Sequence, residues 1–125
     1  MIYGIGTDIV EVKRIREVLN KYGIALAKKI LTSQELLTYK KTEGKENFLA
    51  KRFAAKEAFA KALGTGMRSP VNFKSIEIIH DLLGKPKIKT VPELTILMKS
   101  HNIIHCLLSI SDEKNIAAAF VILEQ

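Results

Sequence analysis

The sequence contains no tryptophan, few aromatic residues and a single cysteine. The scarcity of aromatic side chains, together with the absence of any RRM, KH or zinc-finger pattern, argues against a nucleic-acid-binding module. A lone thiol cannot form an internal disulfide, so Cys106 indicates a reducing compartment, and we expect the protein in the cytoplasm. Cys106 lies in an apolar run with no charged neighbour to lower its pKa, which is typical of a core residue rather than a nucleophile.

Long apolar segments are also missing. No run approaches the roughly 20 residues that a membrane-spanning helix needs, and the first residues lack the basic and apolar regions of a signal peptide. The histidines His80, His101 and His105 are scattered, so they do not form a zinc-binding pattern. Repeats, low-complexity stretches and linkers are absent, and 125 residues suffice for a core of their own. We therefore expect one domain over residues 1–125, without membrane attachment.

Positive charge exceeds negative charge. Twenty Lys and Arg residues against 13 Asp and Glu residues give a formal net charge of +7. This balance predicts an acidic partner, which from charge alone can be a nucleic acid, a phosphorylated small molecule or an acidic protein. The basic residues concentrate in a helical region from Glu11 to about Leu31, which Gly23 is expected to break: Lys13, Arg14, Arg16, Lys21, Lys28 and Lys29. This face is either ordinary solvated surface or a docking surface for an acidic partner.

The stretch from Phe48 to Gly66 reads as one long central helix that ends at Gly64. An apolar stripe runs along it, and alanines fill most of the remaining arc; the stripe is formed by Leu49, Phe53, Ala60 and Leu63. A helix that is apolar on nearly all sides is expected to be buried on nearly all sides.

Four charged residues stand out in this apolar helix. Arg52 and Lys56 project into the apolar stripe, where an unpaired charge is costly. Glu57 and Lys61 are four residues apart, so they can form an ordinary helix pair that contributes about 0.2–0.5 kcal/mol. They can equally belong to a functional site, and the helix alone does not decide between these two interpretations.

Residues Ile2–Val10 alternate in the manner of a β-strand. Both faces are mostly apolar, so we expect an interior strand. Gly4 and Gly6 leave open space on the face that carries Asp8, which allows another backbone or a ligand to approach closely. Asp8 is either the N-cap of a capping box with Glu11 or a metal ligand, and it can partly serve as both.

The rest of the chain predicts shorter elements. Thr32–Glu35 is a helix start signal, and Pro92 begins a helix that runs to about Ser100. Two strand pairs follow from the pattern, one formed by residues 76–79 with Pro86–Thr90 and one by Ile103–Ile110 with Ile116–Leu123. Because helices come mostly first and strands mostly later, the sequence predicts an α+β fold with an antiparallel sheet packed against the central helix.

Asp8 and Glu57 are carboxylates in the two most apolar elements of the chain. If the strand packs on the central helix, the two groups can face each other, and a hard divalent cation would resolve their repulsion. Mg²⁺ is bound by one or two carboxylates together with waters and phosphate oxygens. Positive charge for such phosphates is available on Arg52, Lys56 and Lys61, and the Gly64-Thr65-Gly66 turn lets backbone N–H groups approach a phosphate. These residues indicate metal-assisted phosphoryl-type transfer.

Two segments carry a family resemblance: Gly4-Ile5-Gly6-Thr7-Asp8-Ile9-Val10-Glu11 and Arg52-Phe53-Ala54-Ala55-Lys56-Glu57-Ala58-Phe59-Ala60-Lys61-Ala62-Leu63-Gly64-Thr65-Gly66. They closely resemble holo-acyl-carrier-protein synthase, a 4′-phosphopantetheinyl transferase, and the resemblance spans the whole chain. It implies that coenzyme A binds with Mg²⁺ and that the serine hydroxyl of an apo acyl carrier protein attacks the β-phosphate. Phosphopantetheine is then transferred and adenosine 3′,5′-bisphosphate leaves, a step of fatty acid biosynthesis.

The resemblance also assigns roles to residues. The family's metal carboxylates fall on Asp8 and Glu57, and its phosphate-contacting lysine falls on Lys61, so these three are the expected catalytic residues. Coenzyme A binding is expected to involve Lys61 together with nearby groups, namely Arg52, Lys56, Gly64, Thr65 and Gly66. The carrier-docking helix falls on the Arg14–Lys28 region. Small members of the family are homotrimers with sites between subunits, so a neighbouring chain is expected to help complete the site.

One departure from the family pattern matters. Many members carry Ser-x-Ser-His near the last hairpin, whereas this chain has Ser109-Ile110-Ser111-Asp112. The role of that histidine does not transfer, and the group that removes the serine proton stays open. Two other functions compete with the transferase: a basic nucleic-acid-binding module without catalysis, and a carrier-protein binder that kept the scaffold but lost the chemistry.

Overall fold

The computed structural model describes residues 1–125 in full. The elements follow in the order β1 (Ile2–Glu11), α1 (Val12–Tyr22), α2 (Ile24–Ile30), α3 (Ser33–Lys41), α4 (Lys45–Leu63), the short 3₁₀ helix η1 (Phe73–Ser75), β2 (Ile76–His80), β3 (Pro86–Thr90), α5 (Pro92–Ser100), β4 (His105–Asp112) and β5 (Ile116–Glu124). None of the helices combines the length and apolar character needed to cross a membrane.

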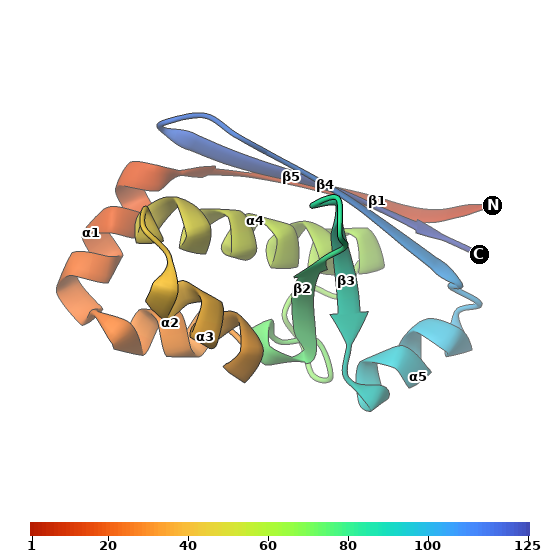
Figure 1. The fold of residues 1–125 in the computed structure, drawn as a ribbon. Coiled ribbons are helices and arrows are strands. Elements are labelled where there is room, and N and C mark those ends of the chain that lie inside the picture. Colours follow the sequence, from red (N-terminus) through yellow and green to blue (C-terminus); the bar gives the residue numbers. More distant parts are fainter.

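Two antiparallel sheets are formed. The larger sheet has the strand order β1-β5-β4, and β2 pairs with β3 in the smaller sheet. The larger sheet lies along one side of α4, while α2 and α3 lie on the other side (Figure 1). One cluster of buried apolar residues joins these layers. The predicted α+β class, with an antiparallel sheet against a long central helix, is confirmed.

β1 is an edge strand of the larger sheet, and the expectation of an interior strand was wrong. Only β5 pairs with it, and its outer face is open, with Ile5 58% and Ile9 71% exposed. The inner face, which carries Gly6 and Val10, is buried against α4. Apolar residues on both faces of a strand therefore do not show that its own chain covers both of them.

The central helix α4 is buried on nearly all sides, as its composition predicted. Residues from every part of its circumference, among them Leu49, Ala54 and Phe59, are fully buried. The helix begins at Lys45 rather than Phe48, directly after Gly44, and ends before Gly64, whose φ of 85° lies in the left-handed region that glycine adopts without strain.

Two glycines allow β1 to lie directly on the backbone of α4. A Cβ on Gly4 would sit 2.0 Å from the carbonyl oxygen of Ala62, and a Cβ on Gly6 would sit 1.9 Å from that of Ala58. Of the two occupants that the glycine spacing allowed, a backbone or a ligand, the backbone of α4 fills this space. The contact fixes the position of Asp8 along the axis of α4, beside the last turns of the helix.

The shorter helices follow their local signals with one exception. Gly23 separates α1 from α2 with a positive φ of 60°, and Thr32 forms a full capping box with Glu35 at the start of α3. The capping box between Asp8 and Glu11, one of the two interpretations of Asp8, is not formed. β1 continues through Glu11, which makes no side-chain cap, and this leaves the Asp8 carboxylate available for other contacts.

Replacing Gly6 with alanine tests the close packing of β1 on α4. The added methyl group would overlap the Ala58 carbonyl, so we expect the free energy of unfolding to fall by about 3 kcal/mol or more in urea titrations. Thr7→Ala, on the exposed face of the same strand, is the matched control and should change stability by no more than about 0.5 kcal/mol. A Gly6→Ala protein as stable as the wild type would contradict this packing.

Candidate active site

Asp8 and Lys61 form the best-defined ion pair of the candidate site. Asp8 Oδ1 accepts a hydrogen bond from Lys61 Nζ at 3.0 Å, and the same ammonium donates to the carbonyl oxygen of Thr7 at 3.0 Å. Asp8 is mostly buried, whereas the Lys61 side chain is 55% exposed. Lys61 thus reaches across to β1, and the ordinary pair with Glu57 on its own helix is not formed.

Glu57 lies on the same face of α4 as Lys61, one turn earlier. Burial raises the pKa of the Glu57 carboxyl, the nearby Asp8 carboxylate raises this pKa further, and Lys61 partly opposes both effects. The two carboxylates are therefore close enough to repel each other. The packing of β1 on α4 brings together Asp8, Glu57 and Lys61, the three residues that the sequence singled out.

The second oxygen of Asp8 needs a partner that the chain does not provide. Asp8 Oδ2 is buried and accepts no hydrogen bond. Such an oxygen is costly to bury unless a cation or a donor satisfies it. Two carboxylates with hard oxygen ligands fit Mg²⁺, which keeps several waters and takes substrate phosphates as further ligands. No group of three or more His, Cys, Asp or Glu side chains forms a complete metal cage, so Asp8 and Glu57 would supply only part of the coordination shell.

Asp8 stands between two hollows of about 310 Å³ each. One is mostly apolar and lies between β1, α1, α2 and α4; it is lined by Asp8, Ile9, Val10, Arg14, Ile15, Val18, Leu26, Ile30 and Phe53. The other lies over the sheet and includes Ser109 and Ser111 of β4. The sequence did not reveal either hollow, because their walls combine residues from elements that are distant along the chain.

Arg52 and Lys56 do not join Asp8 and Glu57 within this chain. Both are buried and contact Glu35 of α3, Lys56 Nζ at 2.6 Å from Oε1 and Arg52 Nε at 3.5 Å from Oε2. Burial lowers the pKa of both basic groups, and the Glu35 carboxylate opposes this shift. Sequence analysis missed Glu35 because a capping-box glutamate is already explained by its own helix.

Arg52 keeps part of its hydrogen-bonding capacity unused. Its guanidinium lies 4.4 Å from the centre of the Phe48 ring, and its buried Nε has no hydrogen-bond partner. The side chain lines a cleft of about 250 Å³ together with Glu77 and His80. Arg52 thus lies beside Glu35 and Glu77, on the side of α4 opposite to Lys61.

The Gly64-Thr65-Gly66 turn begins directly after the last residue of α4, three residues beyond Lys61. Gly64 and Gly66 have φ values of 85° and 61°, and open space surrounds the position of a Cβ at each of them. Such a backbone can approach a phosphate without side-chain interference. The turn follows the helix end that carries Glu57 and Lys61, and it is exposed at both glycines.

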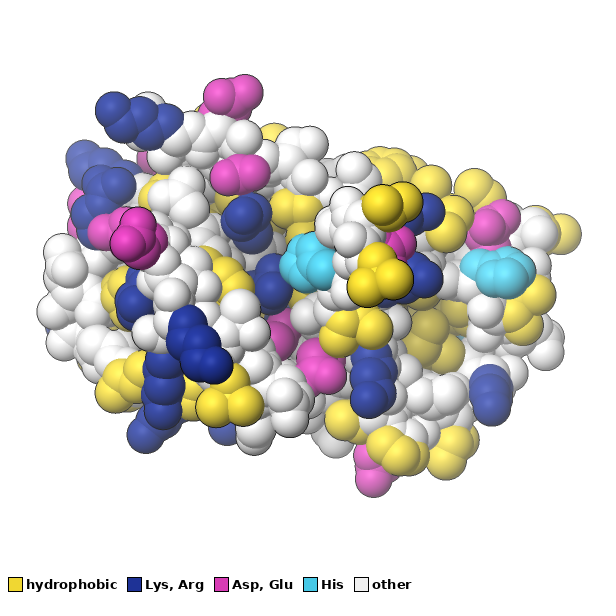
Figure 2. All heavy atoms as spheres, viewed as in Figure 1, with side chains coloured by type: hydrophobic (Ala, Val, Ile, Leu, Met, Phe, Trp, Pro, Cys, Tyr) yellow, Lys and Arg dark blue, Asp and Glu magenta, His cyan; other side chains and the backbone are white.

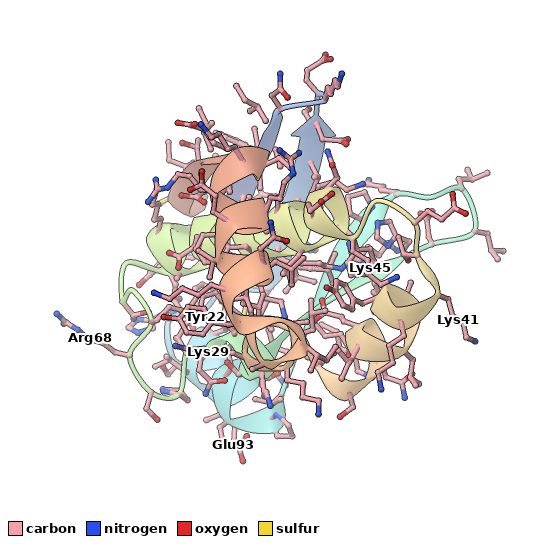
Figure 3. The ribbon with its side chains drawn as sticks, turned by 90° about the vertical axis from the view of Figure 1, so that its left-hand side faces the viewer. Tyr22, Lys29, Lys41, Lys45, Arg68 and Glu93 are labelled. Carbon is pink, nitrogen blue, oxygen red and sulfur yellow. The ribbon has the colours of Figure 1, made fainter.

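Basic side chains gather at the end of the molecule formed by α1, α2 and α3, on the left in Figure 2. Figure 3 looks onto this end and shows α1 in front. Arg14 belongs both to this basic face and to the apolar hollow beside Asp8.

Cys106 lies away from this site. Burial raises the pKa of its thiol to about 12, which fits the predicted core role.

Comparison of the sequence with known proteins identifies the family of the chain. Residues 4–121 match the family model of the 4′-phosphopantetheinyl transferase superfamily. The chain is 55% identical to a holo-[acyl-carrier-protein] synthase from Nitrosospira multiformis over the full length of both proteins.

Solved structures agree with this match. The crystal structure of holo-[acyl-carrier-protein] synthase from Neisseria meningitidis superposes with a TM-score of 0.97 at 51% identity, covering 100% of both chains. The enzyme from Bacillus anthracis, solved in complex with CoA (3′,5′-ADP), superposes with a TM-score of 0.82 at 42% identity, covering 98% of this chain and 96% of that chain. The chain therefore belongs to the holo-acyl-carrier-protein synthases of the 4′-phosphopantetheinyl transferase superfamily.

Proposed function

We propose that this enzyme moves the 4′-phosphopantetheine group of coenzyme A onto a serine of an apo acyl carrier protein, with Mg²⁺, as part of fatty acid biosynthesis. The serine oxygen forms a bond to the β-phosphorus, the bond from this phosphorus to the bridging oxygen breaks, and adenosine 3′,5′-bisphosphate leaves with that oxygen. The observation that carries the proposal is the buried, unpartnered Asp8 Oδ2 beside Glu57 and Lys61.

Asp8 and Glu57 would hold the metal ion. Bound Mg²⁺ supplies charge neutralisation and orientation for the pyrophosphate. Lys61 donates two of its three N–H groups to Thr7 and Asp8, and its half-exposed ammonium can give the third to a phosphate oxygen beside the carboxylates. The open backbone of Gly64–Gly66 would contact the same phosphates. The serine hydroxyl gives its proton to a base at the site as the new bond forms.

The carrier protein would dock on the basic end of the molecule. Acyl carrier proteins are acidic, so complementary charge on α1 and α2 speeds their capture and makes it sensitive to salt. The apolar hollow beside Asp8 gives an apolar side chain of the carrier a place to be buried, with Arg14 at its wall. This arrangement directs the carrier's serine toward the carboxylates.

Assembly into a homotrimer with sites between subunits would explain two features, the exposed apolar face of the larger sheet and the position of Arg52. The outer face of the larger sheet exposes apolar side chains from all three strands: Ile5, Ile9, Leu107, Ile116 and Phe120. A contiguous exposed apolar face of this kind is typical of subunit interfaces. Arg52, which cannot serve Asp8 and Glu57 of its own chain, would then contact a coenzyme A phosphate at the site of a neighbouring chain.

The competing functions have less support. The charge that motivated a nucleic-acid-binding module concentrates on α1 and α2, beside the apolar hollow and Asp8, which a nucleic acid does not require. A carrier-protein binder without chemistry would not need a buried carboxylate oxygen next to a second carboxylate. Turnover alone separates this last alternative from the transferase.

Neutralising either carboxylate tests the proposed reaction. With coenzyme A, Mg²⁺ and an apo carrier protein, the wild type should add the mass of one phosphopantetheine to the carrier, as measured by mass spectrometry. We expect Asp8→Asn and Glu57→Gln to lower kcat/KM by about 100-fold or more, because each loses a metal ligand. Glu57→Gln should keep or raise the Tm, since burial and Asp8 both disfavour its charge.

The control for these variants is Glu113→Gln, which removes an exposed carboxylate from the closing hairpin. It should retain wild-type turnover and Mg²⁺ dependence. Absence of any mass gain with the wild type would reject the transferase, and full activity of Asp8→Asn at low Mg²⁺ would reject the metal role.

Reversing the charge at Arg14 tests the carrier-docking face. We expect Arg14→Glu to raise the KM for the carrier about tenfold at low salt, with the KM for coenzyme A unchanged, because an acidic partner would meet a like charge at the hollow. Lys99→Glu makes the same change of charge on the exposed side of α5 and should have little effect. Equal effects of the two variants would show that only net charge matters.

A further inference from the structure

Lys56 is the most deeply buried charged side chain of the protein, with none of its surface exposed. Its ammonium donates three hydrogen bonds: to the carbonyl oxygen of Ile30 at 2.7 Å, to Glu35 Oε1 at 2.6 Å and to the carbonyl oxygen of Phe73 at 2.9 Å. A neutral amine has only two N–H donors, so these three acceptors require the charged form. All donors are used, and none is left for a substrate phosphate.

The three acceptors belong to three different segments. Ile30 ends α2, Glu35 lies in the first turn of α3, and Phe73 opens η1 directly after the 64–72 loop. The ammonium also lies against the carbonyl end of α2, where a positive charge is favourable. One side chain of α4 therefore holds the ends of both neighbouring helices and the exit of the loop that contains Gly64–Gly66.

Glu35 extends this network to the small sheet. Its Oε1 also accepts from the backbone N–H of Thr32 at 2.9 Å, and its Oε2 accepts from that of Ile78 in β2 at 2.9 Å. The carboxylate is thus fixed by two backbone groups before it meets Lys56. Because Glu35 is fixed and binds Lys56 of α4, it limits how far α4 can rotate about its own axis.

The same network reaches the hollow beside Asp8. The side chain of Ile30 lines this hollow, and the ring of Phe73 stacks on Phe53, which also lines it, with 5.6 Å between the ring centroids. Lys56 therefore holds two segments whose side chains form or support a wall of the proposed carrier site.

Glu57 follows Lys56 directly, so the two side chains leave the helix about 100° apart. On one face α4 is pressed against Gly4 and Gly6, and on another it is held by Lys56. These two contacts together fix the rotation of the helix and hence the direction of Glu57 and Lys61 toward Asp8.

We propose that Lys56 is a positioning residue of the transfer site: its ammonium, bound to α2, α3 and η1, holds α4 so that Glu57 and Lys61 stay aligned with Asp8. The inference rests on the proposed transferase function for its kinetic consequences. It replaces the expectation that Lys56 contacts the phosphates of coenzyme A.

Two variants test this role. Lys56→Met shortens the unbranched side chain by one atom, removes the three donors and leaves Glu35 with Arg52 as its only basic partner. Lys56→Gln keeps an amide with two N–H donors for these acceptors and leaves Glu35 paired with Arg52, so it should fold if Lys56→Met does not. Lys45→Met, a lysine-to-methionine change at the start of the same helix, is the matched control.

We expect both variants to lower kcat by about 10–100-fold at a temperature well below their Tm, with the KM for coenzyme A changed less than about threefold. Circular dichroism gives the folded fraction to which kcat is referred. Lys56→Gln should have a higher Tm than Lys56→Met, because its amide still donates hydrogen bonds, without recovering kcat. Lys45→Met should keep the wild-type kcat.

A readout without turnover separates failure of this inference from failure of the proposed function. In ¹⁵N spectra, the amides of residues 57–61 and 64–66 should shift in both Lys56 variants and stay in place in Lys45→Met. If the wild type transfers nothing, the proposed function fails and these spectra still test the positioning. A kcat per folded molecule within about twofold of the wild type with unmoved amides, or failure of both variants to fold, would overturn the proposal and leave Lys56 a residue of stability alone.

Discussion

The direct contact between the backbones of β1 and α4 is the constraint on which the rest of the structure depends. It requires two glycines on the strand and small residues on the helix, because any Cβ at Gly4 or Gly6 would collide with a carbonyl oxygen of α4. The strand thus lies close enough for Lys61 to reach both Asp8 and the carbonyl of Thr7. A wider separation would leave the two carboxylates apart, with no shared position for a cation.

The charged residues of α4 are stabilised in two different ways. On the side of α2 and α3, Glu35 compensates Arg52 and Lys56, and backbone carbonyls complete the hydrogen bonds of the lysine. On the side of β1, the partly exposed Lys61 pairs with Asp8 and not with Glu57, and an oxygen of Asp8 is left without a partner. In the first arrangement Lys56 is fully satisfied within the chain, whereas Arg52 Nε has no hydrogen-bond partner. The second is incomplete within the chain, which is typical of a site that binds something else.

Features governed by local chemistry were predictable from the sequence. The break at Gly23, the capping box at Thr32, the burial of α4 and the close approach permitted by Gly4 and Gly6 each depend on a few neighbouring residues. The proximity of Asp8 to Glu57 followed from placing the two most apolar elements against each other. The partner of Lys56 was not predictable, because Glu35 lies 21 residues earlier on another helix and already had a role in a cap. The open face of β1 was missed as well, since an apolar face that its own chain leaves exposed has the same pattern as one that it buries.

The lack of an exposed face on α4 limits how this enzyme can change during evolution. In an amphipathic surface helix, about half of the positions tolerate substitution because they project into water. In α4 even the smallest side chains are enclosed, with Ala54, Ala55 and Ala58 fully buried, so a larger residue on almost any side meets a neighbouring element. Neutral drift is therefore directed to the exposed positions of α1, α3 and α5.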